Sequence, residues 1–312
     1  MPDYKLPDTI YTDDRLPNPG ELRNYRKDYS SARIYNFYDA AVADQLCSDG
    51  MIPYFANSFL IECGLDFSDM VFAKYNRIRN EDYQIATIIR KVDGAEIVQK
   101  EALTSKAQKH IFRMSSNVNP FLNVQNLKGS MQGTKYVTDY VQGQDLDASL
   151  YPYRNDKEAL VQKIREILQN HFVPDEGCLI DFTMTDDYRC IFGEQYISGA
   201  KCLEATNVDM ILSNLRITEE GCVFCIDNEW VFEFPIPYEY VLWRSLSNLY
   251  YKYMVYLKNK MTRNQFLREF HLDENNFQVY SNMDLHFYRY SIGSDYTEKY
   301  RKSAMTYNLR FV

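Results

Sequence analysis

Residues 207–230, NVDMILSNLRITEEGCVFCIDNEW, carry three polar side chains at intervals that suit phosphate chemistry. Asp209 precedes Asn214 by five residues, and Asn214 precedes Asp227 by thirteen. Two carboxylates and an amide supply hard oxygen atoms, which Mg²⁺ prefers, and Mg²⁺ is usually held by one or two carboxylates together with substrate phosphates. If the fold brings these three residues together, they form a site for magnesium and a phosphate group.

The segments between these residues predict a β-hairpin that would bring them together. Apolar residues 215–217 and 222–226 flank a turn at 218–221, the pattern of two strands joined by a turn. Asp209 and Asn214 then lie on the entry side of the hairpin, and Asp227 returns beside them. A structural role is open for each residue taken singly, because Asp and Asn near turns commonly close the turn through their own side chains.

With these intervals the chain resembles the protein-kinase-like phosphotransferases, including the aminoglycoside-phosphotransferase branch. The resemblance implies an α+β fold of two lobes, with a β-rich N-lobe and a mostly helical C-lobe. It also implies ATP and Mg²⁺ as cofactors, Asp209 as the catalytic base, and Asn214 and Asp227 as metal ligands. Three sequence motifs, I-D-x-E-W, V-F-E-F-P-I-P and V-L-W-R-S-L, resemble a narrower group within this family. That group is the kinase modules of bacterial methyltransferase–kinase proteins of O-antigen-type polysaccharide assembly.

The same resemblance implies nucleotide-binding residues upstream of the hairpin. Residues 83–92 and 95–100 predict two strands joined by Asp93-Gly94, a strong hairpin signal. Lys100 ends the second strand, where a kinase lysine contacts the phosphates; a solvated position at a strand end is the alternative. A strand at 135–141 leads to the segment that binds adenine in the family, here Asp139, Tyr140 and Val141.

Two departures from the family pattern favour a second hypothesis, and a third weakens the protein-kinase branch and leaves the small-molecule or glycan branch open. The predicted helix at 103–114 contains no Glu or Asp to pair with the lysine, and residues 77–83 lack the glycines of a phosphate loop. Asn207 stands where protein kinases usually have His. The main hypothesis is an ATP- and Mg²⁺-dependent transfer of a phosphoryl group to a hydroxyl of a saccharide or other small acceptor. The alternative is a pseudokinase that serves as a scaffold among other polysaccharide-assembly domains.

The resemblance also suggests a division of the chain. Residues 1–64 are expected to be an N-terminal extension, because P-D-Y-K-L-P, I-Y-T-D-D and F-A-N-S-F-L-I-E resemble the end of a methyltransferase domain. No glycine-rich loop for S-adenosylmethionine accompanies them, so an active methyltransferase is not expected, and the chain is expected to be a fragment or trimmed homologue. Residues 65–142 would form the N-lobe and residues 143–312 the C-lobe.

Bulk properties fit a cytoplasmic enzyme that partner domains can hold at the inner face of a membrane. The net charge of −8 argues against a nucleic-acid partner, and no apolar run predicts a transmembrane segment. Seven scattered cysteines, including a C-x-x-C at 222–225, predict free thiols. The 27 tyrosines fit either a sugar site or an aromatic core. Helices are predicted at 157–172, 240–258 and 273–290, and near 31–49.

Overall fold

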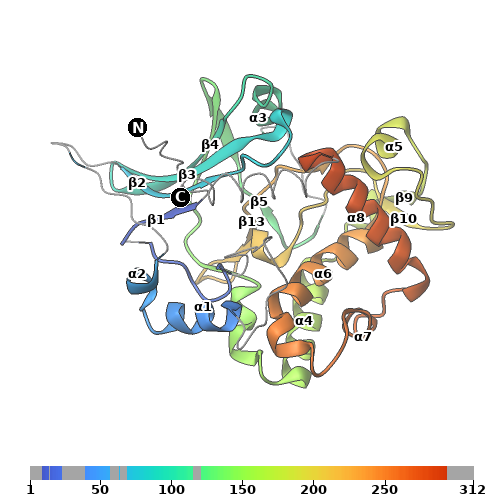
Figure 1. Cartoon of the computed structure of the whole chain (residues 1–312). Helices are drawn as coiled ribbons and strands as arrows, with labels where there is room; N and C mark the ends of the chain where they lie inside the picture. The colour runs from blue at the N-terminus through green and yellow to red at the C-terminus, as the bar shows by residue number, and fades with distance from the viewer. Residues whose placement is uncertain are drawn as a thin grey trace, which may run out of the picture. The chain divides into compact units, whose positions relative to one another are not determined.

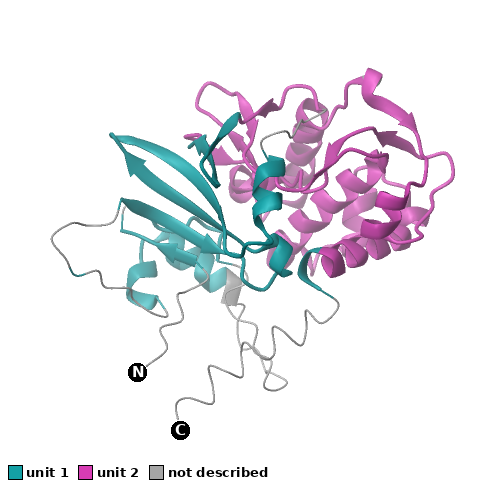
Figure 2. Cartoon of the chain, turned by 90° about the horizontal axis from the view of Figure 1, so that it is seen from above, with its two compact units in different colours: residues 1–115, 128–140, 291–312 teal, residues 116–127, 141–290 magenta. Residues whose placement is uncertain are grey.

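The computed structural model is a mixed α+β protein, with most of its long strands in the first half and its long helices in the second (Figure 1). The structure describes residues 9–13, 15–22, 39–56, 63, 69–114 and 121–293. The chain divides into two units: residues 1–115, 128–140 and 291–312 form unit 1, and residues 116–127 and 141–290 form unit 2 (Figure 2). Of the predicted helix near 31–49, residues 31–38 lie outside the described residues.

Unit 1 is built on an antiparallel sheet of six strands in the order β1-β2-β3-β4-β7-β6. Its elements are β1 (Thr9–Tyr11), α1 (Asp39–Ser48), α2 (Ile52–Phe55), β2 (Met70–Tyr75), β3 (Ile85–Val92), β4 (Ala95–Ala102), α3 (Gln108–Arg113), β6 (Gly129–Gln132) and β7 (Lys135–Asp139). β1 pairs with β2, so residues of the N-terminal segment form the edge of this sheet.

Strand β3, in the middle of this sheet, packs side chains against the core on both of its faces. On one face Ile85 packs with Tyr136 and with Ile111 of α3, and on the other Ala86 packs with Ile10 of β1. The β3–β4 hairpin forms at the predicted turn, because Asp93 and Gly94 both adopt the positive φ values, 51° and 83°, that a tight hairpin turn needs. This prediction is confirmed, and the hairpin fixes the strand that carries Lys100.

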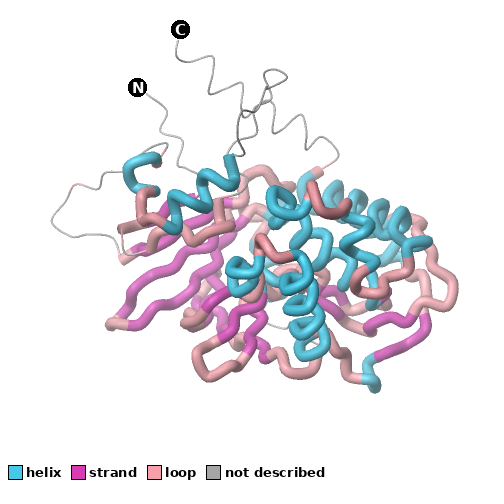
Figure 3. The backbone as a smooth tube through the Cα atoms, turned by 90° about the horizontal axis from the view of Figure 1, so that it is seen from below, coloured by secondary structure: helices cyan, strands magenta, loops and turns pink. Residues whose placement is uncertain are grey.

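Unit 2 holds the α-helices of the second half of the chain, which are drawn in cyan with the other helices in Figure 3. They are α4 (Lys157–His171), α5 (Asp186–Phe192), α6 (Tyr238–Leu257), α7 (Arg263–Arg268) and α8 (Phe277–Ile292), whose residues through Tyr290 belong to this unit. Asp156 caps α4, since its Oδ1 accepts the N–H of Ala159 at 3.0 Å. α6 is buried along most of its length, including the polar residues Arg244, Ser245 and Ser247.

Short strands, arranged in small sheets, lie between these helices. A four-stranded sheet has the order β5-β13-β12-β8, and a two-stranded sheet joins β11 to β14. A third sheet has the order β15-β10-β9. The strands are β5 (Gln125–Asn126), β8 (Gln144–Asp145), β9 (Leu179–Asp181), β10 (Lys201–Leu203), β11 (Thr206–Asn207), β12 (Leu215–Ile217), β13 (Val223–Cys225), β14 (Val231–Phe232) and β15 (Ile236–Pro237).

Much of the aromatic content serves the core of unit 2. Tyr188, Tyr240, Tyr253 and Tyr280 are among the largest fully buried side chains. Phe192 packs against the ring of Tyr240 at a centroid distance of 5.5 Å. For these tyrosines the core explanation of the composition is correct. Within the described residues, no helix is long and apolar enough to cross a membrane.

Candidate functional site

The predicted hairpin exists and brings Asn214 beside the residue that precedes Asp227. β12 and β13 pair antiparallel, with Leu215 opposite Cys225. The pairing continues one step further, because the N–H of Ile226 donates to the carbonyl of Asn214 at 2.9 Å. Asn214 and the residue before Asp227 are therefore hydrogen-bonded neighbours, so residues thirteen apart in the sequence meet at one end of the hairpin.

The loop that carries Asp209 is held by buried residues on both sides. Val208 and Met210 are almost fully buried, and Asp209 between them is partly exposed. The N–H of Val208 donates to the carbonyl of Trp230 at 3.0 Å, which continues the β11–β14 pairing. The alternation of apolar, polar and apolar residues in V-D-M thus anchors the loop while one carboxylate faces out of the core.

Asn207 links the Asp209 loop to the Asp227 loop. Its side chain is fully buried; its Nδ2 donates to the carbonyl of Asp227 at 2.6 Å, and its Oδ1 accepts the N–H of Asp209 at 2.9 Å. A buried amide that satisfies both of its ends in this way fixes the two loops relative to each other. The residue that departs from the protein-kinase pattern therefore has a clear structural role here.

Asn214 is oriented by Asp209. Its Nδ2 donates to the backbone carbonyl of Asp209 at 2.9 Å and lies 3.5 Å from Asp209 Oδ2. A carbonyl oxygen can only accept, so the nitrogen end of the amide must face Asp209. The amide oxygen of Asn214 then points away from this bond, as an oxygen that coordinates a metal would have to do.

A buried arginine, not singled out from the sequence, holds Asp209 from the other side. Arg244 of α6 donates from Nη2 to Asp209 Oδ1 at 3.0 Å and from Nε to the carbonyl of Val208 at 3.0 Å. Its Nη1 pairs with Asp284 of α8. Burial disfavours the charge of Arg244, but Asp284 and Asp209 outweigh this effect and hold the pKa of the guanidinium well above its ordinary value.

Asp227 closes a turn with its own side chain. Its Oδ1 accepts the N–H of Glu229 at 3.1 Å, the type of bond that Asp commonly forms two residues ahead. Glu229 is buried, with 6% of its surface exposed, so of the two roles open to it from the sequence, support of the site or a surface ion pair, burial excludes the surface one. The two functions proposed for Asp227, turn closure and metal binding, are compatible because a carboxylate has a second oxygen.

The proposed nucleotide residues of unit 1 are on its sheet. Lys100 lies in β4, opposite Thr87 and Tyr136, and is buried. Asp139 is the last residue of β7, and Tyr140 follows it with its N–H donated to the carbonyl of Glu96 at 3.1 Å.

Val141 is the first residue of this stretch of unit 2, and its carbonyl already has a partner. Arg216 of β12 donates from Nη1 to the carbonyl of Val141 at 3.3 Å. The same guanidinium donates from Nε and Nη2 to Asp145 Oδ1, at 2.8 and 2.6 Å. Only 10% of the Arg216 side chain is exposed, so Arg216 and Asp145 form a buried ion pair. The same arginine also fixes the position of Val141.

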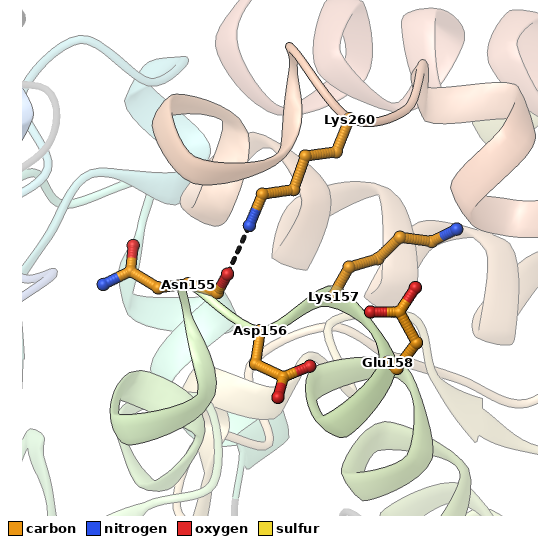
Figure 4. Close-up of a pocket in the computed structure, with 5 residues that line it drawn as sticks. All are labelled: Asn155, Asp156, Lys157, Glu158 and Lys260. Atoms are coloured by element: carbon orange, nitrogen blue, oxygen red, sulfur yellow. Dashed lines mark hydrogen bonds between the residues drawn. The ribbon is translucent and has the colours of Figure 1, made fainter.

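A shallow hollow of about 510 Å³ lies elsewhere in unit 2, at the start of α4 (Figure 4). It is lined by charged and amide side chains: Asn155, Asp156, Lys157, Glu158 and Lys260. Asp156 caps the helix, and Lys260 donates to the carbonyl of Asn155, as the dashed line in Figure 4 marks. These internal bonds already occupy the polar groups that a small anion would use at this helix start.

The donor set of the candidate site restricts the metals that fit it. Among the described residues no group of three or more His, Cys, Asp or Glu side chains gathers to hold a metal ion. A metal at the hairpin would depend on the amide oxygen of Asn214, the carboxylate of Asp227 and oxygens from a phosphate ligand. This set of hard oxygens fits Mg²⁺ better than zinc, whose protein sites are built mainly from Cys and His ligands.

Comparison with known proteins adds no assignment: no protein-family model and no curated protein sequence matches this chain.

Proposed function

We propose that this protein transfers a phosphoryl group from Mg·ATP to a hydroxyl group, with a saccharide as the acceptor class, and that its units are the two lobes of a protein-kinase-like fold. The observation that supports it best is the network at the end of the β12–β13 hairpin. There the side chains of Asn207 and Asn214 fix the Asp209 and Asp227 loops through three hydrogen bonds of 2.6 to 2.9 Å.

In this proposal each polar residue has one task. The carboxylate of Asp209 accepts a hydrogen bond from the acceptor hydroxyl and orients its oxygen for attack, and takes the proton as the bond to phosphorus forms. Asn214 and Asp227 hold Mg²⁺, which when bound neutralises charge on the phosphate oxygens. Lys100 of unit 1 contacts the phosphates, and Asp139, Tyr140 and Val141 contact the base. The products are ADP and the phosphorylated acceptor.

The rigidity of the network suits this chemistry. Phosphoryl transfer depends mainly on positioning and on electrostatic stabilisation of the phosphoryl oxygens, with little covalent work for the protein. The ion pair with Arg244 holds the Asp209 carboxylate in place, so that it can orient a hydroxyl. Buried partners on both sides of Asp209 reduce the cost of ordering it when substrates bind.

A pseudokinase role is the second candidate, and one structural feature favours it. Helix α3 consists of Gln108–Arg113 and has no acidic side chain, and Glu101 beside it pairs with Lys135 at 3.0 Å. The acid that would be expected to pair with Lys100 is therefore not supplied by this helix. A scaffold that binds nucleotide without turnover, as part of a polysaccharide-assembly complex, would tolerate this arrangement.

Two isosteric variants separate these proposals. ADP formation from Mg·ATP is measured with a panel of mono- and oligosaccharides as acceptors, for wild type, Asp209→Asn and Asp227→Asn. The phosphotransferase proposal predicts acceptor-stimulated ADP formation, lowered about 10²- to 10⁴-fold in Asp209→Asn with nucleotide binding retained. Nucleotide binding without stimulated turnover in wild type supports the scaffold role, and the absence of both contradicts the two proposals together.

A further inference from the structure

Residues 141–146, which follow Tyr140, are bound to strand β12 of the β12–β13 hairpin. β8 pairs with β12, with Gln144 opposite Ile217 and Asp145 opposite Arg216. The N–H of Leu146 donates to the carbonyl of Leu215 at 2.8 Å, which extends the pairing. Residues 144–146 therefore pair with β12, the strand that begins directly after Asn214.

A glycine makes this approach possible. Gly143 has a φ of 144°, and a Cβ atom at this position would lie 2.2 Å from the carbonyl oxygen of Ile217. Only glycine fits both the backbone conformation and the space. The backbone between Val141 and Asp145 is thus pressed against β12, and the site of closest approach lies in the middle of the segment.

Arg216 completes the attachment at the end nearest to the proposed base-binding residues. Its guanidinium spans from the carboxylate of Asp145 to the carbonyl of Val141, through three donated hydrogen bonds of 2.6 to 3.3 Å. A guanidinium is planar and presents its donors in a fixed fork, so it defines the distance and direction between the two groups it joins. A lysine, as a point charge, would not define both.

We propose that Arg216 is a positioning residue for nucleotide binding: it holds Val141, the last residue of the base-contacting segment, in register with the hairpin that carries Asn214 and Asp227. The inference rests on the proposed function. It goes beyond it by assigning to Arg216, through Asp145, the task of keeping the base site pre-ordered. The Val141 carbonyl already accepts from Arg216, so the base is expected to use the other backbone groups of the segment or to share this oxygen.

The test separates base positioning from metal binding. ATP is titrated calorimetrically with and without Mg²⁺ into wild type, Arg216→Met and the double variant Arg216→Met/Asp145→Asn. The double variant is included because the single one leaves a buried carboxylate without its partner and is at risk of not folding. Arg165→Met is the control: its Arg165–Glu269 ion pair is also in unit 2, but 38% of the Arg165 side chain is exposed.

The expected result is that the double variant binds Mg·ATP about tenfold or more weakly, the factor that corresponds to loss of a charge-assisted hydrogen bond. The ratio of affinities with and without Mg²⁺ should stay as in wild type, because Asn214 and Asp227 are unchanged, and Arg165→Met should bind normally. Wild-type affinity in a folded double variant overturns the inference and leaves the proposed function intact. If the double variant binds ATP equally well with and without Mg²⁺, the inference is also overturned, because Arg216 would then support the metal site as well as the base site. If wild type binds no ATP, the proposed function itself fails.

Discussion

Replacement of Arg244 by methionine is the most demanding test of the way the structure holds Asp209. The guanidinium is buried between two carboxylates, Asp209 and Asp284, and also donates to the carbonyl of Val208. In Arg244→Met the two carboxylates face each other without a cation, and the carbonyl loses a donor. The methionine keeps most of the side-chain length, so the main loss is of charge and hydrogen bonds.

The expected cost follows from the burial of the three groups. Removal of one partner from a buried ion pair typically destabilises a protein by about 3–5 kcal/mol. Here 7% of the Arg244 side chain is exposed, against 20% of Asp209 and 23% of Asp284, so water screens the carboxylates in part. We therefore expect the lower end of that range, about 3 kcal/mol. Asp284→Asn leaves the bond to Asp209 in place and should cost only about 1–2 kcal/mol.

Urea unfolding followed by tryptophan fluorescence measures these differences. Both tryptophans, Trp230 and Trp243, belong to unit 2, so the signal reports the unit that contains the ion pairs. The double variant Arg244→Met/Asp284→Asn should recover part of the stability lost in Arg244→Met, because one of the two facing charges is gone. A loss below about 1 kcal/mol in Arg244→Met, or a double variant less stable than that single one, would refute the reasoning.

Three further predictions concern single positions. Gly143→Ala should destabilise unit 2 by more than the ~1 kcal/mol typical of a glycine substitution, because its Cβ would meet the Ile217 carbonyl at 2.2 Å; a thermal melt checks this. Asn207→Ala leaves buried partners unsatisfied at two loops, so it should cost about 2–4 kcal/mol in a urea melt and weaken Mg·ATP binding. Burial raises the pKa of the Cys202 thiol to about 12, so at pH 8 Cys202 stays protonated and should resist iodoacetamide, while exposed Cys190 reacts; mass spectrometry distinguishes them.

Elements with strong local signals could be predicted from the sequence. The Asp93-Gly94 turn specifies its hairpin through two positive φ values, and the Asp156 cap marks the start of α4. Helix α3 was predicted to begin at residue 103 but begins at Gln108, because β4 continues to Ala102, which pairs with Ile85. Strand pairing to a distant segment, which local propensity does not contain, decided that boundary.

The candidate site was predictable only in part, for a similar reason. The spacing of Asp209, Asn214 and Asp227 indicated a hairpin, and the hairpin exists. Arg244 and Arg216 were missed, since each finds its partners 35 or more residues away, and an arginine in a helix or strand usually faces water. The signal that could have revealed them is their setting, R within V-L-W-R-S-L and within L-R-I, where a charged residue interrupts an apolar run and therefore needs a buried partner.

The measurement that tests the central claim most directly is calorimetric titration of ATP, with and without Mg²⁺, into wild type and Asp227→Asn. The substitution keeps the size of the side chain and the oxygen that accepts from the Glu229 N–H, but removes the charge that would hold the metal. If Asp227 holds Mg²⁺ beside bound ATP, wild type should bind ATP in a Mg²⁺-dependent manner and the variant should lose that dependence. ATP binding with the same Mg²⁺ dependence in both proteins, or no ATP binding by folded wild type, would contradict it.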